Sequence, residues 1–300
     1  MLLKDYVTAL RTDLSGIYPQ EEANALVDIV CQECFGVQSY TRIIEPGYEI
    51  KDKLLIKADS VTRRLLQNEP IQYILGHAEF CGRRFTVSPS VLIPRPETEI
   101  LCKDAYQSAM RVFRNRSAYG KGASAVKILD LCTGSGCIAW TLALDVPGAS
   151  VTAIDISEEA LSVARSQKFD IGKGRSPRFV KADIFDDEQM QEALGDGPAF
   201  DIIVSNPPYV FERERGQMRP NVLNYEPAIA LFVPDDDTML FNRKIAEIAK
   251  KYLYTDANAC VEINEAAGPE SAALFRENGF KSVETLKDIF GKNRIVKFQK

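Results

Sequence analysis

The sequence predicts an α/β protein in which a small helical domain precedes a mostly parallel seven-stranded sheet that ends in an antiparallel hairpin. Two patterns in the 300 residues indicate this fold. Before residue 70 apolar residues recur at helical spacing, whereas after residue 126 strand-like runs alternate with helical patterns. Such alternation is typical of a parallel sheet that helices cover on both faces. We therefore expect a helical domain at residues 1–69, a β-hairpin linker at 70–97 and an α/β domain at 98–300.

The helical domain is expected to contain about four helices. Tyr6, Leu10 and Leu14 share one helical face, and breaks follow near residues 16–20, 36–39 and 46–47. The last helix is predicted at roughly 50–67. In the linker, short pieces at 71–75, 79–80 and 84–87 are rich in β-prone residues and are separated by glycine and proline.

The α/β domain supplies the seven strands. They are predicted at 126–131, 150–155, 178–183, 200–205, 259–263, 282–286 and 295–298, with a helix after each of the first five. Only residues 287–294 separate the last two strands. Because this connection is too short for a helical crossover, we expect that pair to be antiparallel.

Composition excludes several classes of protein. The net charge of −5 gives no broad attractive field for nucleic-acid phosphates, so stable nucleic-acid binding is not expected. No apolar run reaches the length of a membrane span, and the start of the chain lacks the features of a signal peptide. Seven cysteines, an odd number, suit a reducing compartment. With one histidine and one C-x-x-C, at Cys31 and Cys34, a metal site lacks ligands. We expect a cytoplasmic protein without a bound metal.

A glycine-rich turn follows the first strand. Cys132, Thr133, Gly134, Ser135 and Gly136 stand between that strand and a helical run. The two glycines allow a sharp turn and a close approach of the backbone to a ligand at a helix N-terminus. Read alone, residues 134–139 also fit the G-x-G-x-x-A pattern of nicotinamide dinucleotide sites, and a turn without a ligand stays open as well.

Two carboxylates end the next strands. Asp155 closes the second strand, 19 residues after Gly136, where a carboxylate can accept hydrogen bonds from both hydroxyls of a ribose. Asp183 closes the third strand at the same edge. In a methyltransferase it would face the adenine amino group, with Ile184 against the ring; capping of the following helix beside Asp186 is the alternative.

The fourth strand runs into Asn206-Pro207-Pro208-Tyr209, the most informative motif of the chain. Neither proline has an N–H to donate, so the main-chain carbonyl at Pro207 can project from the sheet. The Asn206 side-chain oxygen is a second acceptor. Two fixed acceptors can hold both hydrogens of one NH2 group, and the Tyr209 ring offers a flat wall for a planar substrate.

This motif suits methyl transfer to a conjugated nitrogen. An amide nitrogen is a poor nucleophile because its lone pair is delocalised, and holding both N–H bonds can aim that lone pair at a methyl donor. Asn206 and Pro207 are therefore the expected catalytic groups. Amino-methyltransferases that act on adenine, cytosine or glutamine share the tetrapeptide, so the motif alone leaves the acceptor open.

The flanking segments resemble the HemK/PrmC family, the peptide chain release factor glutamine N5-methyltransferases. They are PIQYILG at 70–76, EFCG at 79–82, VLIPRPETE at 91–99, YEPAIALF at 225–232 and DIFGKNR at 288–294. The resemblance covers residue 70 to the C-terminus. It implies the class I S-adenosylmethionine methyltransferase fold, which is Rossmann-like, and transfer of a methyl group to the glutamine of a Gly-Gly-Gln loop.

The resemblance also assigns the site. Residues 132–136, Asp155, Asp183, Ile184 and Asn206 would bind S-adenosylmethionine, and residues 206–209 the substrate glutamine. The helical domain would help to dock a release factor. The chain departs from the family pattern at Cys132, where a glycine is usual, and at Ile184, where an aromatic residue is common.

Besides a nicotinamide-dependent dehydrogenase, for which no obvious hydride-transfer acid or base follows the glycine turn, two alternatives remain at this point. One is an adenine N6-methyltransferase on DNA or RNA, which would need basic surfaces and a target-recognition domain. The other is a non-catalytic protein that senses the cofactor or binds the translation machinery. No role is assigned to Arg95 and Glu97 in the stiff segment at 94–98, which either places a charged pair beside the site or is a linker with solvated charges.

Overall fold

The computed structural model describes residues 1–118, 125–170, 172 and 175–300. These residues form two compact units. One contains Met1–Gly76 together with Arg219–Tyr225, and the other contains His77–Met218 and Glu226–Lys300. The domain boundaries after residues 69 and 97 stay a prediction.

The first unit is helical. It contains α1 (Leu3–Ser15), α2 (Gln20–Val30), the π-helical turn η1 (Cys31–Phe35), α3 (Thr41–Ile44), α4 (Asp52–Leu65), α5 (Ile71–Leu75) and α10 (Pro220–Tyr225). The apolar faces of α1, α2 and α4 meet in one core, which includes Leu10, Leu14, Val27 and Leu65. The expected helical spacing is therefore confirmed there.

The segment at 71–75 is a helix, so the strand-like character assigned to it was wrong. Ile71, Ile74 and Leu75 all pack on the core of the first unit, and their spacing of three and four residues is that of a helical face. Packing of that face outweighs the weak β-propensity of the residues. Pro70 precedes the first turn, and Gly76 ends the helix with φ at 77°.

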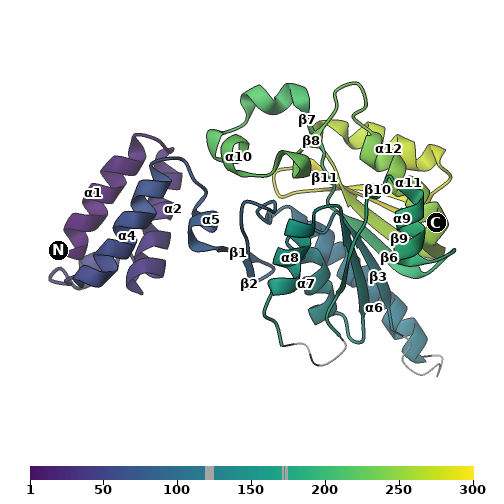
Figure 1. The fold of residues 1–300 in the computed structure, drawn as a ribbon, viewed down its shortest axis with the longest axis horizontal. Helices are drawn as coiled ribbons and strands as arrows, with labels where there is room; N and C mark the ends of the chain where they lie inside the picture. Colours follow the sequence, from purple (N-terminus) through teal and green to yellow (C-terminus); the bar gives the residue numbers. More distant parts are fainter. Residues whose placement is uncertain (119–124, 171, 173–174) are drawn as a thin grey trace. The chain divides into compact units, whose positions relative to one another are not determined.

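The second unit is built on the seven-stranded sheet (Figure 1). Its order is β10-β11-β9-β6-β3-β4-β5. The strands are β3 (Lys127–Leu131), β4 (Ser150–Asp155), β5 (Arg178–Lys181), β6 (Phe200–Ser205), β9 (Leu253–Glu262), β10 (Lys281–Lys287) and β11 (Asn293–Gln299). The first five pair in parallel, and β11 is antiparallel to both β9 and β10. The predicted fold class is confirmed, including its closing hairpin.

Alternating strand residues build a core on each face of the sheet. Ile128 and Val204 belong to the core that contains α6 (Thr98–Ala118) and α7 (Cys137–Asp145). Leu129 and Ile203 belong to the opposite core, with α9 (Asp187–Leu194), α11 (Leu240–Tyr252) and α12 (Gly268–Glu277). Burial on both faces explains why these strands read as nearly continuous apolar runs. The 21-residue helix α6 has no counterpart among the elements predicted from the sequence.

The remaining elements of this unit are short. The strands β1 (His77–Phe80) and β2 (Arg83–Thr86) form the expected antiparallel hairpin. A second small pair joins β7 (Val210–Phe211) to β8 (Phe232–Val233). Helix α8 (Glu158–Ser166) follows β4, and the 3-10 turns are η2 (Glu212–Gln217), η3 (Ala228–Ala230) and η4 (Glu265–Ala267). Within the described residues, no helix is long and apolar enough to cross a membrane.

The strand order places a ligand crevice at one edge of the sheet. The chain proceeds outward from β3 through β4 to β5 and then returns to β6 on the other side of β3. At such a reversal of strand order, the loops after the strands diverge and leave a crevice at the carboxyl ends of the strands. The candidate residues after β3, β4, β5 and β6 all lie at this edge.

Candidate active site

The glycine-rich turn between β3 and α7 adopts a strained backbone that orients it toward the crevice. Cys132, Gly134 and Gly136 have φ values of 59°, 54° and 78°, all in the left-handed region. Below the turn, the buried Asp130 accepts a hydrogen bond from the Thr133 hydroxyl at 2.6 Å. Burial raises the pKa of Asp130 to about 7. Asp130 thus anchors the turn from inside the fold.

The two glycines of the turn have different tasks. A Cβ at Gly136 would lie 3.0 Å from the Ala164 Cβ and 3.2 Å from the Phe179 ring, so the helix packs there at the distance that only a glycine permits. A Cβ at Gly134 would meet no atom within 4 Å among the described residues. Gly134 instead leaves open space on the side of the crevice.

Asp155 is held at the end of β4 by main-chain groups. Its Oδ2 accepts from the Gly134 N–H at 2.8 Å, and its Oδ1 accepts from the Ser157 N–H at 3.0 Å. Burial raises the pKa of this carboxyl, while the two N–H groups act in the opposite direction. Each oxygen retains lone-pair capacity for a further donor. This is the geometry that a ribose diol requires.

Asp183 and Ile184 lie just after β5. The Asp183 Oδ1 accepts from the Phe185 N–H at 2.9 Å. The N-cap of α9 is Asp186, which accepts from the Glu188 and Gln189 N–H groups, so the capping role considered for Asp183 belongs to its neighbour. Ile184 is buried and Phe185 is partly exposed.

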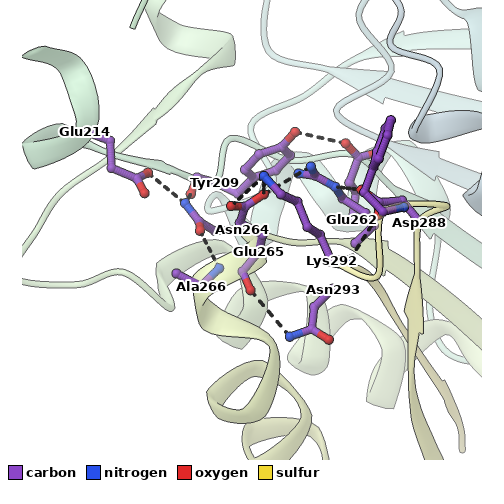
Figure 2. A network of polar contacts seen from close by, with 11 residues as sticks. Tyr209, Glu214, Glu262, Asn264, Glu265, Ala266, Asp288, Lys292 and Asn293 are labelled. Carbon is purple, nitrogen blue, oxygen red and sulfur yellow. Dashed lines mark hydrogen bonds and ion pairs between the residues drawn. The ribbon is translucent and has the colours of Figure 1, made fainter. Parts of the chain in front are cut away.

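The tetrapeptide after β6 is held by polar contacts at both ends. The Asn206 Nδ2 donates to the Thr98 hydroxyl at 3.1 Å, while the Asn206 Oδ1 is buried with no hydrogen-bond partner among the described residues. The Tyr209 hydroxyl donates to Glu262 at 3.0 Å, and the Tyr209 carbonyl accepts from Asn264 at 3.2 Å (Figure 2). An unpartnered amide oxygen is costly unless a ligand donor satisfies it.

A single cavity of about 260 Å³ connects the two groups of candidate residues. Its lining includes Cys132, Thr133, Gly134, Ser135, Asp155, Asp183, Ile184, Asn206 and Pro208. Among the described residues, Gly136, Pro207 and Tyr209 are not part of that lining. The cavity therefore brings the glycine turn, both strand-end carboxylates and the Asn206 side chain together.

Sequence reasoning missed four residues of this site. Phe185 and Phe241 line the cavity and contact each other edge to face, with ring centroids 5.2 Å apart. Thr98 and Glu262 contact Asn206 and Tyr209. A signal for Glu262 was present, because it is the lone carboxylate within the otherwise apolar run of 259–263, near the same sheet edge as Asp155. Arg95 forms an ion pair with the buried Glu226 at 2.5 Å.

Comparisons with known proteins agree with this architecture. A family described as a methyltransferase domain matches residues 123–265. Among solved structures, the hMettl16 catalytic domain in complex with the MAT2A 3'UTR hairpin 6 aligns with a TM-score of 0.50 and 12% sequence identity. That alignment covers 85% of each chain and shows a shared fold alone.

Closer relatives identify the family. The chain is 41% identical to a release factor glutamine methyltransferase of Bacteroides thetaiotaomicron over 96% of both proteins. It is 36% identical to the protein of that name in Flavobacterium psychrophilum over 99% of both, and 37% identical to that of Neisseria gonorrhoeae over 93% of this chain and 92% of the relative. The chain therefore belongs to the release factor glutamine methyltransferase family.

Proposed function

We propose that this protein transfers a methyl group from S-adenosylmethionine to the side-chain amide nitrogen, N5, of the glutamine in the Gly-Gly-Gln motif of a peptide chain release factor. The observation that carries the proposal is the single cavity, in which the glycine turn and Asp155 share one space with Asn206. Methyl transfer needs such a continuous space because donor and acceptor must meet inside it. Family membership supports the choice of substrate.

Residues at the ends of β3, β4 and β5 would hold the cofactor. Residues 132–136 form the turn, and Asp155 would accept hydrogen bonds from the ribose hydroxyls with its remaining lone pairs. Asp183 would face the adenine amino group, with Ile184 and Phe185 against the ring. The open side of Gly134 and the incompletely satisfied Asp155 fit this ligand. When bound, S-adenosylmethionine supplies a methyl group on a positively charged sulfur.

The acceptor half of the site would orient the glutamine amide. The Asn206 Oδ1, buried and unpartnered, is suited to receive one N–H of the substrate. Pro208 lines the cavity beside Asn206, whereas Pro207 and Tyr209 do not line it. We infer from the motif that the Pro207 carbonyl would receive the other N–H, with Pro208 and Tyr209 as walls. Holding both hydrogens turns the nitrogen lone pair toward the methyl group, and positioning of this kind can contribute on the order of 7 to 11 kcal/mol. The two oxygen dipoles also favour the positive charge that develops on nitrogen.

The proposed substrate also determines the partner protein and the cellular compartment that we expect for this enzyme. Release factors act in translation, so we place the protein in the cytoplasm. Residues 1–69 would contribute to docking of the release factor, while the second unit carries the chemistry. The product of each turnover would be S-adenosylhomocysteine and a release factor with one methylated glutamine.

Mass spectrometry tests the proposal. Release factor incubated with the enzyme and S-adenosylmethionine should gain the mass of one methyl group on a single glutamine. Asn206→Ala should abolish transfer and leave cofactor affinity nearly unchanged. As a matched control, Asn242→Ala removes another buried amide, which is hydrogen-bonded to Ser271, and should retain turnover. A methyl label that appears only in added DNA or RNA would contradict the proposed substrate.

A further inference from the structure

The orientation of the Asn206 amide decides whether the acceptor site can work. An asparagine side chain has two similar ends, one of which accepts hydrogen bonds and one of which donates them. In the proposed function, on which this inference rests, the oxygen must face the substrate NH2 group. With the amide turned over, two donors would face each other, and the substrate would be repelled. Some group must therefore fix which end points into the cavity.

Thr98 is the direct neighbour of the Asn206 amide. It lies at the start of α6, is buried, and accepts from the Asn206 Nδ2 at 3.1 Å. A hydroxyl carries one hydrogen. While its oxygen accepts from Asn206, that hydrogen is available for another acceptor. If the hydroxyl instead donated to Asn206, the amide would present its oxygen to Thr98 and its NH2 group to the cavity.

Glu262 supplies that other acceptor. It ends β9, is 1% exposed, and accepts the Tyr209 hydroxyl at 3.0 Å (Figure 2). The Thr98 side chain lowers the pKa of Glu262 as a hydrogen-bond donor would, and the second carboxylate oxygen, Oε2, is buried and has no hydrogen-bond partner among the described residues, so it is available to the Thr98 hydroxyl. An ionised carboxylate can only accept. The Tyr209 hydroxyl therefore points its hydrogen at Glu262, and a Thr98 hydroxyl that contacts the same carboxylate must do likewise.

We propose that Glu262 is a positioning residue that sets the direction of the hydrogen bonds around the acceptor motif. By drawing the Thr98 hydrogen toward itself, Glu262 makes the Thr98 oxygen an acceptor for Asn206. The Asn206 Oδ1 is then the end that faces the substrate. The same carboxylate anchors the Tyr209 hydroxyl, so one buried charge orders the first and last residues of the tetrapeptide.

The Thr98 hydroxyl is held in this hydrogen-bond direction only while Glu262 is ionised. The pKa of Glu262 is raised to about 7, mainly by burial, and the negative charge of nearby Glu97 acts in the same direction. The Thr98 and Tyr209 side chains and the positive charge of Arg294 act in the opposite direction. Protonation would convert Glu262 into a donor and remove the constraint on Thr98. We therefore expect turnover to fall as the pH drops through about 7.

Arg294 is itself fixed by acidic partners. Its Nε donates to Asp288 at 2.9 Å, and its Nη2 lies 3.1 Å from Glu265. The pKa of Tyr209 lies well above its usual value because of burial and the adjacent Glu262, so Tyr209 stays neutral and continues to donate. Glu262 is thus the group in this network that changes its charge near neutral pH.

Glu262→Gln is the central test, because it keeps the shape and reverses the hydrogen-bond character of one end. The Gln amide can donate to Thr98, which would redirect the Thr98 hydrogen toward Asn206 and turn the Asn206 amide over. We expect kcat for release factor methylation to fall roughly 100-fold, the size seen when reacting groups are misplaced. The dissociation constant of S-adenosylmethionine should change by less than about twofold, because Asp155 and the glycine turn are untouched. The acid limb of the pH–kcat profile near 7 should disappear.

Matched variants separate positioning from loss of structure. Thr98→Val removes the hydroxyl that links Glu262 to Asn206, so kcat should fall while the affinity for S-adenosylmethionine stays nearly unchanged. Thr98→Ser keeps the hydroxyl and should restore turnover. Asp201→Asn removes another buried carboxylate, which is paired with Arg116 at the opposite end of β6, and should leave the kcat of the folded enzyme unchanged. Wild-type kcat and pH profile in Glu262→Gln would overturn the proposal.

A second readout keeps this inference distinct from the proposed function. The NMR signals of the Asn206 side-chain NH2 group should shift in Glu262→Gln and Thr98→Val and stay unchanged in Asp201→Asn. Failure of the wild-type protein to methylate any release factor would contradict the proposed function alone. Unchanged Asn206 signals in both Glu262→Gln and Thr98→Val would contradict the positioning role of Glu262, whatever the substrate is.

Discussion

Replacing each glycine of the cofactor turn by alanine separates backbone strain from crowding. Both positions have a positive φ, which costs a residue with a Cβ about 1–2 kcal/mol, partly offset by the lower entropy of the unfolded chain. At Gly134 nothing else opposes the methyl group, so Gly134→Ala should lower the free energy of unfolding by about 1 kcal/mol. At Gly136 the methyl also meets Ala164 and Phe179 at 3.0–3.2 Å. Overpacking of this kind adds about 1–3 kcal/mol, so Gly136→Ala should cost about 2–4 kcal/mol in total.

Urea unfolding followed by tryptophan fluorescence measures this difference directly. Trp140 is the single tryptophan of the chain and lies in α7. Its ring centroid is 6.2 Å from the ring centroid of Phe179. The reasoning is refuted if Gly136→Ala is no less stable than Gly134→Ala. Calorimetry adds a second comparison, since only the Gly134→Ala methyl enters the cavity and should weaken S-adenosylmethionine binding through direct contact.

Two further predictions concern buried carboxylates. Asp155→Asn should weaken S-adenosylmethionine binding by about 10- to 100-fold, because hydrogen bonds to a charged acceptor contribute about 1.5–3 kcal/mol. Isothermal titration calorimetry measures the dissociation constant. An unchanged affinity would show that Asp155 is not part of the cofactor site. Asp130 binds a proton more tightly in the folded state, where its pKa is about 7, than in the unfolded state. The stabilisation that comes from this tighter proton binding is therefore complete below about pH 4 and is lost as the pH rises through 7. Over that range the free energy of unfolding falls by up to about 1.4 kcal/mol per pH unit. Asp130→Asn should flatten the decline in the free energy of unfolding between pH 5 and 7, and an unaltered slope would contradict the assigned pKa.

The sheet was predictable because its strands carry strong local signals. Residues 150–155 and 200–205 are rich in β-branched residues and each ends in a polar residue, and they coincide with β4 and β6. The third strand was predicted to reach Asp183, but the ladder with β4 ends at Lys181. The glycine turn, Asp155 and the tetrapeptide could be found because each follows a strand in sequence. A parallel sheet brings those strand ends to one edge.

Contacts between segments that are distant in the sequence could not be predicted from the sequence pattern. Thr98 lies 108 residues from Asn206, and Glu262 lies 53 residues from Tyr209. No periodicity relates such pairs, because only the folded sheet brings them together. The helix at 71–75 was missed for a related reason, since its residues are weakly β-prone and only their packing on the helical core favours a helix.

The helical unit is discontinuous in the chain, because Arg219–Tyr225 belongs to it together with Met1–Gly76. Tyr225 donates its hydroxyl to the Gln67 carbonyl at 2.8 Å, and Arg219 is paired with Glu22. On a translating ribosome, elongation from residue 76 to residue 219 takes roughly seven to thirty seconds. By then the segments of β1 through β6 have already been synthesised. The amino-terminal unit consequently acquires its last partners only after much of the catalytic sheet has emerged, and its maturation depends on a downstream piece of the polypeptide.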